Sequence, residues 1–307
     1  MDSPKLGTLV PLLASFAFST VLLVIIPQGS VLAYASKLEA QVLLKWKSNL
    51  QNQNQSTSSL STWTLPPQNA TDSKVMAVSP CRRYSISCNL ANSVIGIKLP
   101  NSNIKGTLND FPFSSLPCLT YIDLHINELF GFIPPQVCQL RLLNMLVLYS
   151  NQFNGSLPSS LGNLSSLTLL CISYNSFSGS IPLEMGNLTN SEKIYMGANF
   201  LTGPIPPTFG KLIKLMELHI SHNELTGSIP LELGNMKLLR KLSLSYNNLT
   251  NSIPSTLANL TDITHFYLLG NQLSSNIPDE LGNLRAMIEL ELGLNQLTGP
   301  FLLLWVN

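Results

Sequence analysis

The histidine and tyrosine side chains of this 307-residue chain gather at recurring positions of its sequence. All four histidines, and six of the eight tyrosines, fall on short segments in which apolar and polar residues alternate. Such alternation is typical of a strand with one buried face, so we expect these side chains to point away from the core. Imidazole titrates near neutral pH, and a phenol ring joins an apolar body to a polar tip. Both therefore suit a contact surface.

Several uses of these side chains are open. For the histidines, metal binding is the least supported use, because no Cys, Asp or Glu completes a recognised ligand spacing. A pH-sensitive contact surface competes with simple solvated histidine. For the tyrosines, a binding face competes with the tendency of large β-formers to occupy any strand surface. We favour a ligand lying along this face over repeats three to eight. The candidate ligand-binding residues are Tyr149, Tyr174, Tyr195, His219, His222, Tyr246, His265 and Tyr267.

Composition argues against several other functions. A formal net charge of +1, with only 11% charged residues, offers no electrostatic footprint for nucleic acid or an anionic membrane surface. The hydrophobic content of 45% excludes bulk disorder. Kinase signatures, a Gly-x-Ser-x-Gly elbow and a His-Glu-x-x-His helix do not occur in the sequence. We therefore expect no enzymatic activity, no cofactor and no metal ion.

The elements that position the candidate residues come from an internal repeat. Eight asparagines are spaced by 24 residues without a slip, and Gly and Ile-Pro recur in the same frame. The Asn amide is expected to bond backbone groups at a buried bend, where an unpaired group costs about 1–3 kcal/mol. One unit cannot bury its own apolar face, so the units must stack into an elongated solenoid with a parallel β-sheet on one side. The predicted Asn ladder is Asn127, Asn151, Asn175, Asn199, Asn223, Asn247, Asn271 and Asn295.

The frame of residues 215–230, Leu-x-x-Leu-x-Leu-x-x-Asn-x-Leu-x-Gly-x-Ile-Pro, resembles the plant-specific leucine-rich repeat. Upstream, the segment that begins at Glu39 and the stretch from Cys81 to Cys88 resemble the N-terminal cap of plant leucine-rich-repeat receptor-like kinases. The resemblance implies a leucine-rich-repeat solenoid, an α/β horseshoe-like fold with a parallel β-sheet on the concave face and a helical N-terminal cap. We expect a signal peptide at 1–35, the cap at 36–93, about nine repeats at 94–302 and a truncated tail at 303–307.

The cap sequence carries its own signals. Ser36, three residues before Glu39, predicts that the cap helix starts with a capping box, and its apolar face would cover the first repeat. The polar stretch that follows is a predicted loop anchored by Trp63. Arg83 and Ser85 stand where the family commonly has Trp and Gly.

Cys81 and Cys88 are predicted to form a disulfide that closes a small loop beside the first strand. The other three cysteines leave an odd thiol whatever the pairing. Unpaired thiols and a Cys118–Cys138 bond both remain open, and Cys171 is expected on the exposed strand face. Other residues depart from the repeat at its Asn, Leu and Gly positions. They are Ser102, Ser191, Asn251 and Ser275.

The N-terminus has the features of a secretory leader. Lys5 precedes an apolar run, and Ala33 and Ala35 frame a predicted cleavage site after Ala35. An uncleaved anchor is the alternative, because about 18 apolar residues could just span a bilayer. Secretion would make Asn-x-Ser/Thr a glycan acceptor. The predicted glycosylation sites are Asn54, Asn69, Asn154, Asn163, Asn187, Asn248 and Asn259.

The resemblance implies the extracellular ligand-recognition region of a receptor-like protein in plant cell-surface signalling, in the apoplast or at the plasma membrane. The expected partners are a secreted peptide or protein ligand and a co-receptor ectodomain, with no nucleic acid and no membrane span in the mature chain. The Ser/Thr kinase domain and C-terminal cysteine cap of full-length family members are missing, so we interpret the chain as a truncated ectodomain. A secreted inhibitor resembling polygalacturonase-inhibiting proteins and a non-functional fragment are the alternatives.

Overall fold

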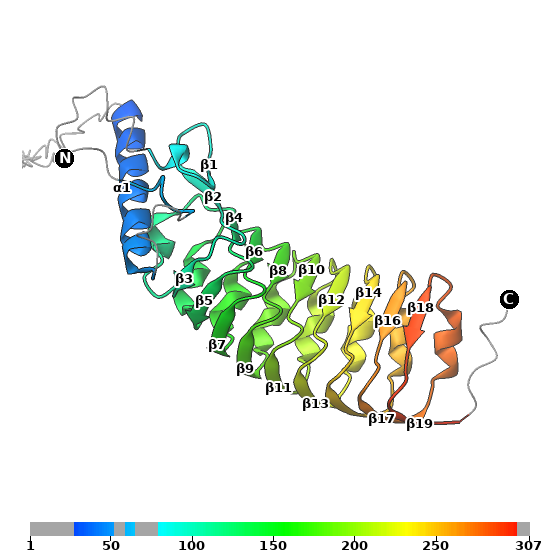
Figure 1. Cartoon of the computed structure of the whole chain (residues 1–307). Helices are drawn as coiled ribbons and strands as arrows, with labels where there is room; N and C mark the ends of the chain where they lie inside the picture. Colours follow the sequence, from blue (N-terminus) through cyan, green and yellow to red (C-terminus); the bar gives the residue numbers. More distant parts are fainter. Residues whose placement is uncertain (1–27, 52–58, 65–78, 300–307) are drawn as a thin grey trace, which may run out of the picture.

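The computed structural model describes residues 28–51, 59–64 and 79–299, with the side chains of residues 28–36 left out. Successive repeats form rungs, each one turn of a coil, that stack side by side along a curved rod (Figure 1). The strands of one sheet follow the concave edge of this rod, and those of a second sheet follow its convex edge. The predicted leucine-rich-repeat solenoid is therefore confirmed.

The concave sheet contains ten strands, all parallel except the first, which pairs antiparallel with the second. Equivalent residues of neighbouring rungs pair directly, so that Tyr195 lies between Cys171 and His219. The strands in spatial order are β1 (Ile86–Cys88), β2 (Val94–Lys98), β4 (Tyr121–Asp123), β6 (Met145–Val147), β8 (Leu169–Cys171), β10 (Lys193–Tyr195), β12 (Glu217–His219), β14 (Lys241–Ser243), β16 (His265–Tyr267) and β18 (Glu289–Glu291).

The convex sheet was not predicted, because we expected a sheet on one side only. It forms because the Leu-x-Gly segments of successive rungs also stack with their backbones in register. Asn251 and Ser275, at the Gly position of their repeats, adopt the same left-handed backbone as the glycines, with φ of 66° and 70°. The strands are β3 (Lys105–Gly106), β5 (Glu128–Gly131), β7 (Gln152–Ser156), β9 (Ser176–Ser180), β11 (Phe200–Gly203), β13 (Glu224–Ser228), β15 (Asn248–Asn251), β17 (Gln272–Asn276) and β19 (Gln296–Thr298).

Short 3-10 helices form one flank of the rod. Pro residues precede most of them in an extended conformation, such as Pro158 with φ −71° and ψ 134°, which agrees with the expected path of the Ile-Pro pair. The helices are η3 (Phe113–Ser115), η4 (Pro135–Gln139), η5 (Ser159–Asn163), η6 (Leu183–Asn187), η7 (Pro207–Lys211), η8 (Leu231–Asn235), η9 (Ser255–Asn259) and η10 (Asp279–Asn283). A further short helix, η2 (Pro80–Arg82), lies in the cap, where it contacts α1 and β1.

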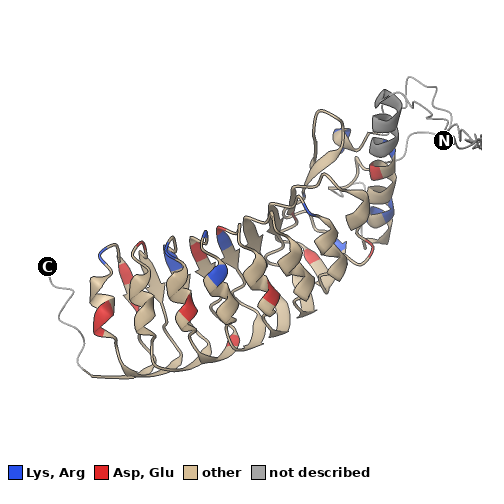
Figure 2. Cartoon of the chain, turned by 180° about the vertical axis from the view of Figure 1, so that it is seen from behind, with Lys and Arg blue, Asp and Glu red and all other residues tan. Residues whose placement is uncertain are grey.

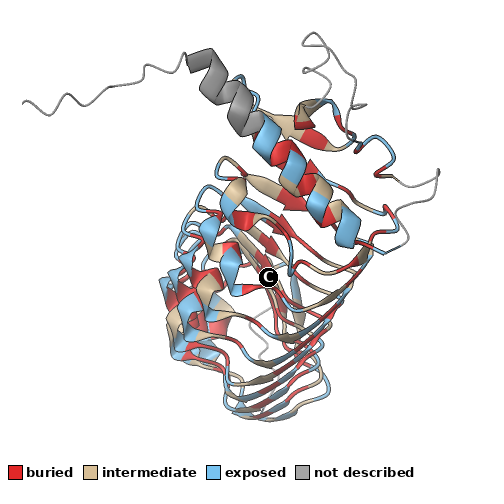
Figure 3. Ribbon diagram, turned by 90° about the vertical axis from the view of Figure 1, so that its left-hand side faces the viewer, coloured by how far each residue is buried: buried red, intermediate tan, exposed pale blue. Residues whose placement is uncertain are grey.

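The core is a continuous apolar column enclosed by the coil (Figure 3). Ser191 replaces a core Leu and is fully buried, and its hydroxyl donates to the carbonyl of Leu167 at 2.8 Å. A buried hydroxyl without a hydrogen bond would destabilise the fold, and this bond avoids that cost. A single small polar residue is therefore accommodated without interrupting the column.

The ladder asparagines behave as predicted. In each, the amide oxygen accepts a backbone N–H of the preceding rung, and the amide nitrogen donates to carbonyls of both rungs. Asn175 accepts from the N–H of Phe153 at 3.0 Å and donates to the carbonyls of Leu148 and Ile172 at 3.0 and 3.1 Å. Each amide thus joins two rungs. In the first rung Ser102 takes this place, with its hydroxyl bonded to the carbonyl of Pro100.

The cap helix α1 (Gln28–Asn49) does not begin with the predicted capping box. It already runs through Ser36, because no Pro or Gly interrupts helix formation between Gly29 and that residue. The Glu39 carboxylate instead accepts from the N–H of Val94 at 2.9 Å. The predicted apolar face is confirmed, since Leu43 and Trp46 are fully buried against the first rungs.

The rest of the cap matches most expectations. Trp63 is buried and its indole donates to the carbonyl of Tyr84, so it anchors the loop as predicted. Cys81 and Cys88 form the predicted disulfide. Cys118, Cys138 and Cys171 are free thiols, so the Cys118–Cys138 alternative is wrong.

Candidate ligand-binding face

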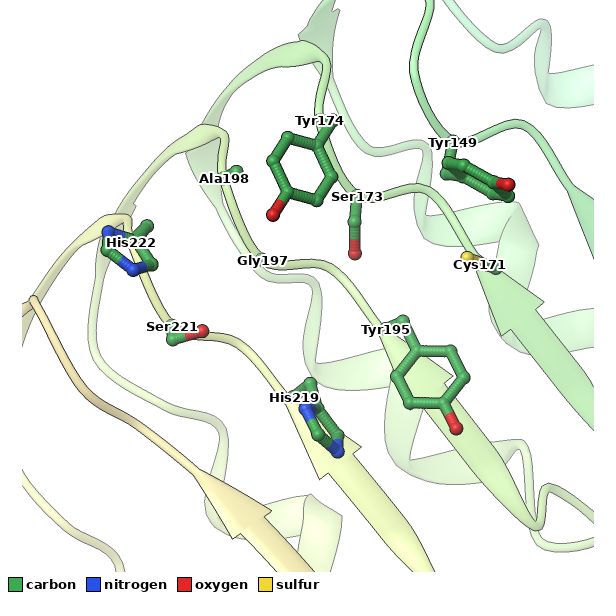
Figure 4. A pocket seen from close by; sticks show the side chains of 10 residues that line it. All are labelled: Tyr149, Cys171, Ser173, Tyr174, Tyr195, Gly197, Ala198, His219, Ser221 and His222. Atoms are coloured by element: carbon green, nitrogen blue, oxygen red, sulfur yellow. The ribbon is translucent and has the colours of Figure 1, made fainter. Parts of the chain in front are cut away.

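A shallow hollow of about 300 Å³ lies on the concave face, over the rungs of β6 to β12 (Figure 4). Five of the eight predicted ligand-binding residues line it. They are Tyr149, Tyr174, Tyr195, His219 and His222. The structure places Tyr246, His265 and Tyr267 on the next rungs, outside the lining of the hollow.

The alternation of apolar and polar residues had suggested that all of these aromatic residues lie in strands, but some of them do not. His219 and His265 do, whereas His125 and His222 follow their strands. His222 lies in the turn before the ladder Asn, with a left-handed φ of 53°. The turn redirects its side chain, so strand alternation alone does not predict where it points.

The floor of the hollow is made of small residues that the sequence analysis missed. Ser173, Gly197 and Ser221 follow the strands of three successive rungs (Figure 4). A Cβ atom on Gly197 would lie 2.9 Å from the carbonyl oxygen of Ser221, so only glycine fits there without a shift. Cys171 and Ala198 complete the lining. The 24-residue spacing could have identified the floor residues, since each stands two positions before its ladder Asn.

One wall of the hollow is held by hydrogen bonds between rungs. The hydroxyl of Tyr195 donates to the Glu217 carboxylate at 2.7 Å, and the ammonium of Lys193 lies 3.0 Å from the same carboxylate. Burial by itself would raise the pKa of Glu217. These hydrogen bonds and the nearby lysines together lower it by more than burial raises it, so the pKa of Glu217 lies below the usual value. Burial and the Glu217 hydrogen bond raise the pKa of Tyr195, so its hydroxyl stays protonated.

His219 stands beside Tyr195 in the same wall, with the two rings edge to face at 5.0 Å. Burial lowers the pKa of His219 more than the Glu217 carboxylate raises it. Its Nε2 lies 3.7 Å from that carboxylate and has no hydrogen-bond partner among the residues that the structure describes. The imidazole therefore lies at a position where burial disfavours its protonation.

Four of the other candidate residues form two pairs of rings. His222 stacks on Tyr246 at 4.5 Å, with an interplanar angle of 19°. His265 and Tyr267 meet edge to face at 6.0 Å. The hydroxyl of Tyr267 donates to the Glu289 carboxylate at 2.6 Å, and partial desolvation together with this bond raises the pKa of Tyr267 to about 12.

The leucine-rich-repeat family model matches residues 142–164, 166–188, 214–236, 238–260 and 262–284. These segments coincide with rungs seen in the structure. These five segments are leucine-rich repeats. The repeats of the chain resemble those of a probable leucine-rich repeat receptor-like protein kinase of Arabidopsis thaliana, At1g35710, with 42% identity over 112 residues. That match covers 36% of this chain and only 9% of the relative's length.

Solved plant receptors share the leucine-rich-repeat fold of this chain. The ectodomain of the Arabidopsis receptor kinase HAESA, in complex with an extended IDA peptide hormone, is 30% identical with a TM-score of 0.72. The alignment covers 86% of this chain and 42% of HAESA. HAESA with IDA and the co-receptor SERK1 gives 28% identity and a TM-score of 0.66, covering 84% and 46% of the two chains.

The predicted glycosylation sites of this chain avoid the concave sheet. Asn154 and Asn248 lie exposed on the convex strands β7 and β15, and the other three described sites are exposed at the ends of 3-10 helices. These three are Asn163, Asn187 and Asn259. Asn54 and Asn69 lie outside the described residues. The concave face would therefore stay accessible in a glycosylated protein.

Other chemistry has little support in the part of the chain that the structure describes. No group of three or more His, Cys, Asp or Glu residues there could hold a metal ion. Burial raises the pKa of the Cys171 thiol to about 11, which disfavours the nucleophilic thiolate. No helix within residues 28–51, 59–64 and 79–299 is long and apolar enough to cross a membrane.

Proposed function

We propose that this chain is the non-enzymatic ligand-recognition region of a plant cell-surface receptor, and that it binds a secreted peptide or protein along its concave face. The observation that carries the proposal is the hollow, where aromatic side chains predicted as ligand-binding residues meet on adjacent rungs. Aromatic rings bury a large area at small entropic cost and are enriched at interfaces.

Two further observations support a ligand on this face. The described glycosylation sites leave the concave face free. Charges of both signs are scattered over the rungs on the side seen in Figure 2, so no block of one sign there favours a highly charged partner instead. The similarity to HAESA, whose ectodomain forms complexes with a peptide hormone and with the co-receptor SERK1, favours a peptide and a second ectodomain as the partners. A kinase domain elsewhere in the full-length receptor would carry the signal inward.

The proposal includes secretion through the leader at residues 1–35 and glycosylation at the predicted sites. The cleavage site after Ala35 falls inside α1, so cleavage would shorten that helix. Secretion of the chain from plant cells, N-terminal sequencing and the mass lost on deglycosylation test these points. Secreted material that begins at Met1 and carries no glycan would contradict them.

The binding proposal is tested by capture of synthetic peptides on the immobilised, secreted protein. Tyr195→Ala and Tyr246→Ala should each weaken capture, because both rings belong to the aromatic face. Lys237→Ala, on the turn after η8 and away from that face, is the control and should bind as the wild type does. Unchanged capture by both tyrosine variants would count heavily against the concave face.

A further inference from the structure

The residue before each ladder asparagine, and before Ser102 in the first rung, has a left-handed backbone, with φ between 45° and 69°. This conformation lets the chain turn inward from the strand to the Asn. It costs an L-residue about 1–2 kcal/mol, whereas Gly pays no such penalty. The residues at this position are Asn101, Ile126, Ser150, Tyr174, Ala198, His222, Tyr246, Gly270 and Leu294.

Four large side chains occupy this costly position while staying exposed. Ile126 and Leu294 lie outside the hollow, whereas Tyr174 lines it and Tyr246 stands beside it. Tyr174 is 67% exposed and Tyr246 is 43% exposed, so neither ring contributes much burial to folding. Asn101 and Gly270 show that the same turn accepts residues that adopt the left-handed conformation at a lower free-energy cost. Backbone strain that folding does not require is concentrated at functional sites.

These strained positions place three rings in a row along the rod. Tyr174 and His222 stand on one side of the small-residue floor, and Tyr195 and His219 stand on the other (Figure 4). Tyr246 extends the row by stacking on His222 at 4.5 Å. A Cβ atom on Gly270 would lie 2.8 Å from the Tyr246 ring, so the glycine leaves room for this ring.

The hollow between the two sides contains no Asp, Glu, Lys or Arg. Of the charged residues next to its wall, Lys193 and Glu217 are paired with each other at 3.0 Å, and Glu217 also accepts from Tyr195. Lys241, opposite Glu217 on the next strand, lies outside the lining of the hollow. A charged ligand group placed over the floor would lose hydration, and no residue that lines the hollow carries a formal counter-charge, which is unfavourable.

We infer that Tyr174, His222 and Tyr246 form an aromatic rim that selects an uncharged segment of an extended peptide lying along the rod over Ser173, Gly197 and Ser221. This inference rests on the proposed function. Strand spacing is about 4.8 Å, so the four rungs that line the hollow span about 14 Å. At about 3.3 Å per residue, this length matches roughly four residues of an extended chain.

Two pools of synthetic 12-residue peptides provide the probe. They are identical in design except that the central four positions are uncharged in one pool and contain Lys, Arg, Asp or Glu in the other. The secreted protein is immobilised, and captured peptides are identified by mass spectrometry. We expect the uncharged pool to be enriched roughly tenfold, and the affinity of captured peptides to fall about tenfold in the Tyr174→Gly/Tyr246→Gly variant.

Thermal unfolding separates a binding role from a structural one. The double Gly variant should unfold at the same or a higher temperature than the wild type, because glycine relieves the left-handed strain. Ser150→Gly, at the same turn but outside the hollow, is the matched control and should keep wild-type capture. Tyr174→Asn provides a second variant that tolerates this backbone.

The outcomes separate the two levels of the proposal. Equal capture of both pools, or unchanged affinity in the rim variants while Tyr195→Ala loses binding, would overturn the aromatic rim and leave the proposed function standing. Capture of neither pool by folded protein would overturn both. Loss of binding together with a lower unfolding temperature in every rim variant would assign these rings a structural role instead.

Discussion

The hydroxyl of Tyr195 donates a 2.7 Å hydrogen bond to the carboxylate of Glu217 on the next rung. Because Glu217 is also paired with Lys193, the bond ties the Tyr195 ring to a fixed point of the concave sheet. The ring is therefore already oriented as one wall of the hollow before any ligand arrives. Such preorganisation reduces the ordering cost of binding.

Tyr195→Phe removes this bond while keeping the ring. We expect the free energy of unfolding to fall by about 1 kcal/mol, because the Glu217 carboxylate loses a donor in a half-buried site. Urea denaturation measures the change. Tyr267→Phe is the matched control, since its bond to Glu289 is exposed and should contribute less. An equal loss in the two variants would contradict the role of burial.

Asn199→Ala should be much more damaging. It removes the acceptor for the N–H of Phe177 and the donor for the carbonyls of Ile172 and Met196, all in the buried ladder. Because each unsatisfied buried group costs about 1–3 kcal/mol, we expect a loss of roughly 3 kcal/mol or more in urea denaturation. Asn235→Ala, at the exposed end of η8, should change stability little. Similar losses in both would contradict the ladder's structural role.

The stability of the protein should depend on His219 as the pH falls. Burial holds the folded-state pKa of His219 below its ordinary value of 6.5, so the unfolded chain binds the proton more readily. The free energy of unfolding should therefore decrease as pH falls through about 6.5 and below, and this decrease should be smaller in His219→Gln. Urea midpoints at pH 7.5 and pH 5 measure the difference.

The comparison with His219→Gln is needed because Glu39 has the opposite effect. Burial raises the folded-state pKa of Glu39 above 4.5, so this residue lowers stability as pH rises through that region. Glu217, with a lowered pKa, loses its contribution only as pH falls below its ordinary range. A pH dependence identical in wild type and His219→Gln would refute the assignment to His219.

Ser85→Gly should stabilise the cap. Ser85 has a left-handed φ of 64°, a conformation that glycine adopts without strain. Relief of this strain should raise the free energy of unfolding by about 0.5–1 kcal/mol. Ser93→Gly, where the structure shows no left-handed backbone, should lower stability instead. A gain in both variants would show that the backbone of Ser85 is not the cause.

Buried Arg83 explains how the cap packs without the family's Trp. One guanidinium nitrogen donates to the carbonyl of Ala40 at 2.7 Å, and the guanidinium carbon lies 6.0 Å from the centre of the Trp63 ring. Burial lowers the pKa of Arg83 to about 10. The sequence signalled a departure at this position, but only the packing of α1 against η2 showed what the arginine contacts.

The sequence by itself determined the rungs, the Asn ladder, the apolar face of α1 and the Cys81–Cys88 disulfide. The apolar face of α1 and the disulfide depend on short-range patterns. The rungs and the Asn ladder depend on residues repeated every 24 positions, and each repeat has the same local geometry. The start of α1 was predicted wrongly, because a capping box is a weak signal when helix-forming residues precede it.

Only the tertiary structure decided which candidate residues form the hollow. Tyr174 and Tyr246 occupy the same turn position, yet only Tyr174 lines the hollow, because the residues facing each ring come from neighbouring rungs. The small floor between the two aromatic sides likewise belongs to three different rungs. Strand alternation indicates which face a side chain takes, but the stacking of rungs and the left-handed turn decide what that side chain meets.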